Sequence, residues 1–125
     1  MLKKTIIIDG KQVPMRASAS TPRLYRIKFG RDLIKDMQSL QTKSKSNEEF
    51  TVEDLTVFEN LAFLMAYTAD VDENGNHLGN VPNSVEDWLD GFDGLFDIYE
   101  ALPQIFELWG LNVAETSTAK KKINK

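Results

Sequence analysis

One segment of the sequence carries the spacing of a cation-binding loop. From Asp70 to Asn76 it reads Asp-Val-Asp-Glu-Asn-Gly-Asn, with oxygen-bearing side chains at the first, third and fifth positions and glycine at the sixth, as in the first half of an EF-hand loop. The twelfth position, where a bidentate glutamate completes such a site, is Val81, and Pro82 follows where a helix should continue. The segment predicts an Asn-Gly turn in preference to a calcium site, and whether the loop binds any cation stays open.

The other side chains capable of acid–base chemistry do not form a catalytic pattern. His77 is the only histidine and the chain has no cysteine, so one copy cannot build a His-based metal cluster or a Ser-His-Asp relay. We expect His77 to be a solvated loop residue. Six carboxylates alternate with aromatic residues, as on the polar side of amphipathic helices: Glu86, Asp87, Asp90, Asp93, Asp97 and Glu100. We therefore expect no enzyme, no metal and no cofactor.

The charges divide the 125 residues into three unequal parts behind a formal net charge of −4. Residues 1–45 carry eleven Lys or Arg and three acids, residues 46–119 carry sixteen acids and no Lys or Arg, and the last six residues carry four lysines. An acidic bulk with a pI near 5.0 disfavours nucleic acid. A surface of two signs favours head-to-tail association into a homo-oligomer, with Arg23, Arg26 and Arg31 as candidate contacts.

Composition predicts one small domain without a membrane span. The longest apolar run, residues 61–67, is far shorter than the roughly 20 residues that a spanning helix needs. The first apolar stretch ends at Ile8, too early for a signal-peptide core, so we expect a cytoplasmic chain. We predict a globular domain over residues 1–111 and a flexible basic tail over residues 112–125.

The N-terminal residues predict a β-hairpin. Residues 4–8 are rich in β-branched side chains, residues 12–17 alternate apolar with polar, and Asp9-Gly10 between them suits a tight turn with positive φ. Because two strands alone are marginally stable in water, one face of the hairpin must pack on helices.

Two helices are predicted next. Thr21 suits the N-cap and Pro22 the first helical position, Gly30 can end this helix, and Asp32 can cap a second one. Residues 41–47 are polar and predict a surface loop. The apolar residues expected to face the core are Leu24, Ile27 and Phe29 in the first helix and Leu33, Ile34, Met37 and Leu40 in the second.

Capping signatures mark the later helices. Thr51 and Asp54 can form a capping box before a helix that is apolar on nearly all sides and therefore buried, and Ser84 begins a similar signature before a short helix. A last helix is predicted over residues 94–111, kinked at Pro103. The fold class is α+β and predominantly α, with the hairpin packed on about four to five helices.

Half of the aromatic residues gather near the end of the domain. Residues 88–109 hold six of the twelve: Trp88, Phe92, Phe96, Tyr99, Phe106 and Trp109. They supply core, or they line an apolar groove with an acidic rim, because aromatic side chains are favoured anchors at interfaces. The candidate partner-binding residues are Trp88, Phe92, Phe96 and Trp109.

Six stretches of the chain follow one another in a recognisable order: residues 7–14, 21–26 (Thr-Pro-Arg-Leu-Tyr-Arg), 29–33 (Phe-Gly-Arg-Asp-Leu), 61–67 (Leu-Ala-Phe-Leu-Met-Ala-Tyr), 87–89 (Asp-Trp-Leu) and 105–109 (Ile-Phe-Glu-Leu-Trp). Together they resemble a family of tail assembly chaperones from long-tailed phages and prophages of Gram-positive bacteria. The similarity covers about residues 4–111 and rests on order, length and composition together.

The resemblance implies a non-enzymatic protein that binds the tape measure protein and keeps it soluble while tail-tube subunits assemble around it. It implies location in the bacterial host cytoplasm and absence from the mature virion. Many such proteins have a longer form made by frameshifting, which could contact the tail tube protein. Lys120 to Lys122 is what an A-rich slippery stretch would encode, so we hypothesise that this chain is the short form. The alternative is that these lysines are a solubilising basic tail. The alternative to the chaperone function is a bacterial or prophage adaptor or regulator that binds proteins through an acidic, aromatic-rich helical face.

Overall fold

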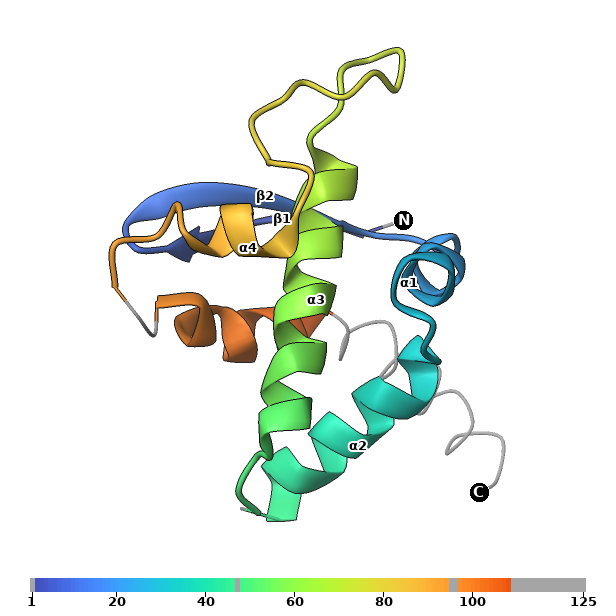
Figure 1. The fold of residues 1–125 in the computed structure, drawn as a ribbon, viewed down its shortest axis with the longest axis vertical. Helices are drawn as coiled ribbons and strands as arrows, with labels where there is room; N and C mark the ends of the chain where they lie inside the picture. Colours follow the sequence, from blue (N-terminus) through green and yellow to red (C-terminus); the bar gives the residue numbers. More distant parts are fainter. Residues whose placement is uncertain (1, 47, 95–96, 109–125) are drawn as a thin grey trace, which may run out of the picture.

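A computed structural model describes residues 2–46, 48–94 and 97–108, and its class is α+β and mostly helical, as predicted (Figure 1). The predicted flexible tail over residues 112–125 lies outside this part. Strands β1 (Leu2–Ile8) and β2 (Lys11–Ala17) pair antiparallel. Asp9 and Gly10 link them with φ of 56° and 69°, so the predicted hairpin turn is confirmed.

Helix α3 (Val52–Ala69) runs through the centre of the molecule, and the hairpin packs one face against it (Figure 1). Residues 61–66 of α3 are all buried, which confirms the prediction from their continuous apolar character. The hairpin contributes alternate residues to the same core: Ile6, Ile8, Val13, Met15 and Ala17. This is the period of two expected of a strand with one buried face.

The predicted capping residues begin three helices. Thr51 Oγ1 accepts from the Asp54 amide at 3.1 Å, and Asp54 Oδ2 accepts from the Thr51 amide at 2.8 Å, which completes the capping box of α3. Asp32 accepts from the Ile34 amide at the start of α2 (Leu33–Ser46). Ser84 accepts from the Asp87 amide at the start of α4 (Val85–Leu89).

The predicted core face of α1 (Thr21–Phe29) was wrong for Leu24 and Ile27 but right for Phe29, which packs against the core. Tyr25 is fully buried and its ring lies 5.1 Å from that of Phe29, whereas Leu24 and Ile27 are exposed. A pair four residues apart places two large rings on one face, and the Tyr25 hydroxyl donates to Asp36 Oδ2 at 3.0 Å across the bend. In α2, Leu33, Met37 and Leu40 are buried as predicted, but Ile34 is exposed.

The start of α1 also differs from the prediction. The helix begins at Thr21 itself, and Pro22 lies in its first turn. Thr21 Oγ1 accepts from the Ser18 amide at 2.9 Å and does not cap the helix. Gly30 ends α1 in the left-handed conformation, with φ of 69°, as predicted.

The loop predicted over residues 41–47 was wrong for residues 41–46, because α2 continues to Ser46. Lys43 in this stretch contacts Asp54 of α3, at the capping box. A polar sequence can therefore stay helical where one of its side chains bonds to the neighbouring helix.

The single helix predicted over residues 94–111 was also wrong. A 3₁₀ helix, η1 (Asp97–Ala101), precedes an α-helical segment at residues 102–108, which places Pro103 in the first turn, where it interrupts no hydrogen bond. Gln104 of this segment donates to the Ile7 carbonyl and accepts from the Ile7 amide, both at 3.3 Å. The segment thus covers part of the free edge of β1.

The basic and acidic parts of the chain are joined within one molecule. Three ion pairs cross between them: Lys4 with Glu107, Arg31 with Glu53, and Lys43 with Asp54. No helix in the described ranges 2–46, 48–94 and 97–108 is long and apolar enough to cross a membrane.

Candidate functional site

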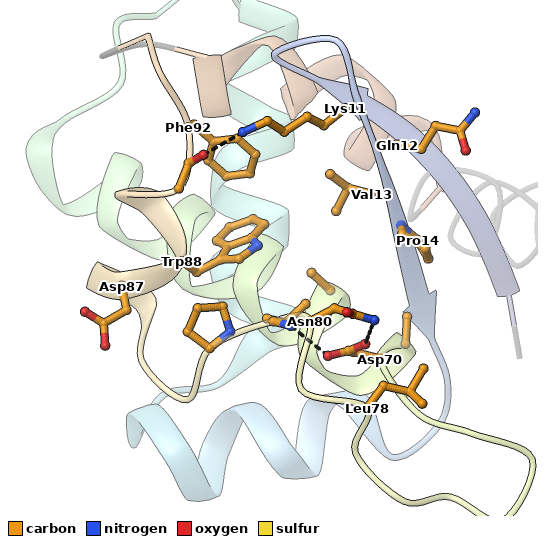
Figure 2. A pocket seen from close by; sticks show the side chains of 15 residues that line it. Lys11, Gln12, Val13, Pro14, Asp70, Leu78, Asn80, Asp87, Trp88 and Phe92 are labelled. Atoms are coloured by element: carbon orange, nitrogen blue, oxygen red, sulfur yellow. Dashed lines mark hydrogen bonds between the residues drawn. The ribbon is translucent and has the colours of Figure 1, made fainter.

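One pocket lies between β2, the end of α3, the loop that follows it, and α4 (Figure 2). Its volume is about 570 Å³, and one side is open to solvent. Figure 2 shows Val13 of β2 and Trp88 of α4 on facing walls, with Leu78 at the opposite end from Phe92. We call this cavity the α4 pocket. Its size is that of a small-molecule site or of a recess for one or two large side chains.

Trp88 and Phe92 form the aromatic wall of the α4 pocket. Trp88 is only 6% exposed, because its ring packs edge-on against Phe63 of α3 at 6.0 Å and against Phe92 at 5.2 Å. Phe92 is half-buried. Trp88 therefore belongs to the core and to the pocket lining at once, while Phe92 has the more accessible ring.

The loop wall is held by Asp70 at the end of α3. Asp70 Oδ2 accepts from the Val81 amide at 2.7 Å, and Asp70 Oδ1 accepts from Asn80 Nδ2 at 3.1 Å. Asp72, the third residue of the EF-hand-like segment, accepts from the amides of Asn74 and Asn76. These carboxylates fold the loop, as expected of the Asn-Gly turn.

His77 is an exposed residue of the loop between α3 and α4, as the sequence predicts, but it also contacts neighbouring side chains. Its ring stacks on that of Tyr67 at 4.3 Å, and Nε2 lies 3.0 Å from the Val81 carbonyl oxygen and 3.6 Å from Asp70 Oδ2. Tyr67 in turn donates to Asn83 Oδ1 at 3.3 Å. The loop between α3 and α4 is thus tied at several points to the end of α3.

Two hydrogen bonds close the other end of the α4 pocket. Lys11 Nζ donates to the Gly91 carbonyl at 2.8 Å and lies 6.0 Å from the Phe92 ring centroid. The Asp93 amide donates to Asp9 Oδ2 at 3.1 Å. The hairpin turn is therefore joined to the segment after α4, and this contact fixes Phe92 against the pocket.

The segment that contributes Trp88 and Phe92 to the α4 pocket also carries exposed carboxylates. Asp87 lines the pocket, and Glu86, Asp90 and Asp93 of the same segment are exposed. Within the described ranges, no ion pair neutralises these four side chains. Their negative charge favours a ligand that carries cations beside its apolar group.

The described residues hold no group of three or more His, Asp or Glu side chains that could bind a metal.

Comparisons with protein-family models, curated proteins and solved structures found no match. An apolar recess beside exposed carboxylates suits an apolar side chain flanked by lysine or arginine.

The structure brings two of the predicted partner-binding residues, Trp88 and Phe92, together in one pocket. Phe96 and Trp109 lie outside the described residues. Part of the remaining lining comes from other elements, such as Val13 of β2 and Leu78 of the loop after α3, and no local pattern could have joined these residues to α4.

Of the residues predicted for self-association, Arg23 and Arg26 are exposed on α1 and form no ion pair with any residue that the structure describes. Arg31 is committed within the chain. Its guanidinium makes a bidentate contact with Asp36, at 2.8 and 2.9 Å, and Nη1 contacts Glu53 Oε1 at 2.8 Å. Arg31 therefore joins the bend between α1 and α2 to α3.

Proposed function

We propose that this protein is a tail assembly chaperone that binds the tape measure protein and keeps it soluble during tail-tube assembly. The observation that carries the proposal is the α4 pocket, a half-open apolar recess beside the exposed carboxylates of the α4 segment. The family resemblance supplies the identity of the partner. Under this proposal the chain acts in the host cytoplasm, has no catalytic role and is absent from the mature virion.

The lining suggests how such a partner would bind. A long helical protein presents apolar side chains at intervals of three or four residues, and one or two of these could enter the α4 pocket against Phe92 and Leu78. Cations on the same helix would approach Asp87 and Asp90. Many copies along one tape measure chain would give strong overall binding from moderate individual contacts.

Co-expression with the tape measure protein of the same phage or prophage tests the proposal. Leu78 is 56% exposed at the pocket, so Leu78→Lys changes the recess without removing core. The matched control is Val52→Lys, since Val52 is 81% exposed at the other end of α3. We expect the wild-type chain and the Val52 variant to co-purify with soluble tape measure protein, and the Leu78 variant to lose most of it.

Two results would contradict the proposal in different ways. A wild-type chain that neither binds nor solubilises the tape measure protein would reject the chaperone function. Binding that both variants retain in full would keep the function and reject the α4 pocket as its site.

A further inference from the structure

Helix α1 carries an exposed apolar face between cations. Ile27 is 66% exposed and Leu24 is 36% exposed, three residues apart on one side of the helix. Arg23 and Arg26 flank them and are also exposed. An exposed isoleucine and leucine between arginines have the chemistry that the α4 pocket accepts: apolar side chains beside positive charge.

The two surfaces cannot meet within one molecule. Helix α1 and helix α4 lie on opposite sides of α3 (Figure 1), and each packs against α3. Because α3 and its buried side chains separate them, the α1 face of one copy can reach only the pocket of another copy.

We propose that the α4 pocket also receives the Leu24–Ile27 face of a second copy of this chain. Ile27 enters the recess beside Phe92 and Leu78, and Arg23 and Arg26 approach the carboxylates of α4. The α1 face and the α4 pocket belong to the same chain. Their complementary charges therefore favour this contact whatever other partner the protein binds. It revises the contact set expected from sequence, because Arg31 is already paired with Asp36 and Glu53.

Such a contact joins two different surfaces, so each added copy leaves one pocket and one α1 face free. Association is then head-to-tail and open-ended, and does not stop at a symmetric dimer. Because the contact includes charges near the surface, raising the ionic strength weakens it.

Two complementary variants test the arrangement by sedimentation velocity over a range of concentrations. Ile27→Glu removes the α1 face and keeps the pocket, whereas Leu78→Lys alters the pocket and keeps the α1 face. We expect wild-type chains to form a concentration-dependent series of oligomers that shortens at high salt. Each variant alone should lose about tenfold or more in association constant.

The mixture of the two variants gives the decisive result. The intact pocket of one and the intact α1 face of the other should form a one-to-one complex and nothing larger. The Val52→Lys variant changes an apolar residue that is more exposed than Ile27 or Leu78 and lies outside both surfaces, so it should associate as the wild type does. Circular dichroism of each variant serves as the control for folding.

Three outcomes would overturn the inference. The wild-type chain could stay monomeric at every concentration, or the Ile27 and Leu78 variants could associate as strongly as the wild type. Association that appears only after deletion of residues 112–125 would show that the chain's own C-terminal segment occupies the pocket. Co-purification measures tape measure binding independently of self-association, so the two proposals can fail separately.

Discussion

Replacing Asp70 by alanine should loosen the loop wall of the α4 pocket and destabilise the protein. The substitution removes the acceptors of the Val81 amide, at 2.7 Å, and of Asn80 Nδ2, at 3.1 Å. Hydrogen bonds to a charged acceptor contribute about 1.5–3 kcal/mol each. Asn80 is exposed and regains water, so we expect a total loss of about 2–3 kcal/mol, or a decrease in Tm on the order of 10 °C.

Asp70→Asn is the graded control, because its remaining carbonyl oxygen can still accept from the Val81 amide. We expect it to lose about 1 kcal/mol. Urea unfolding followed by circular dichroism gives both values, and hydrogen exchange should show faster exchange at the Val81 amide in the alanine variant. A free energy of unfolding for Asp70→Ala within about 0.5 kcal/mol of wild type would refute the role assigned to Asp70.

The same experiment tests the EF-hand-like segment. Because Asp70 and Asp72 already accept hydrogen bonds from the loop, we expect calcium to leave the wild-type Tm unchanged. An increase in Tm with calcium that is lost in Asp70→Ala would show that these carboxylates bind the ion instead.

Three further predictions concern other parts of the chain. Burial opposes ionisation of Asp54, but hydrogen bonds from Lys43 and Thr51 outweigh burial and lower the pKa of Asp54. Ionised Asp54 therefore stabilises the folded protein above about pH 4, and this contribution is lost as the pH falls through the folded-state pKa. Urea unfolding should show Asp54→Asn about 1–2 kcal/mol less stable than wild type at pH 7, with the difference shrinking in acid. Burial and the hydrogen bond to Glu59 raise the pKa of Tyr99 to about 12. Neutral Tyr99 therefore stabilises the folded protein below about pH 10, and this contribution is lost as the pH rises through 12. An ultraviolet titration of Tyr99→Phe should lack the phenol that ionises near pH 12. Sequencing the gene should reveal an A-rich run at the codons of Lys120 to Lys122 with an overlapping downstream frame; three AAG codons would remove the short-form hypothesis.

Features decided by neighbouring residues could be predicted from the sequence. Asp9-Gly10 specifies the hairpin turn through its positive φ, and Thr51 with Asp54 specifies the start of α3, because each depends on bonds within a few residues. The buried centre of α3 could also be predicted, since its apolar side chains leave no side suited to water.

Features decided by contacts between distant residues could not be predicted from the sequence. The core face of α1 is fixed by Tyr25, whose hydroxyl bonds to Asp36 beyond the bend, although Ile27 is the more apolar side chain. The sequence around Trp88, with its aromatic residues and carboxylates, predicts a partner-binding residue but not the pocket that Trp88 lines. The pocket beside it exists only because β2 and the loop before α4 meet there, and nothing in the local sequence of α4 indicates that meeting.

The most direct test of the central claim is site-specific photo-cross-linking of the full chain in cells that also express the tape measure protein. A photoreactive phenylalanine analogue at position 78 reports on the α4 pocket, and the same analogue at position 52 reports on the exposed start of α3. We predict cross-links to the tape measure protein from position 78 and not from position 52. Equal cross-linking from both positions, or none from position 78 while the two proteins co-purify, would contradict the account.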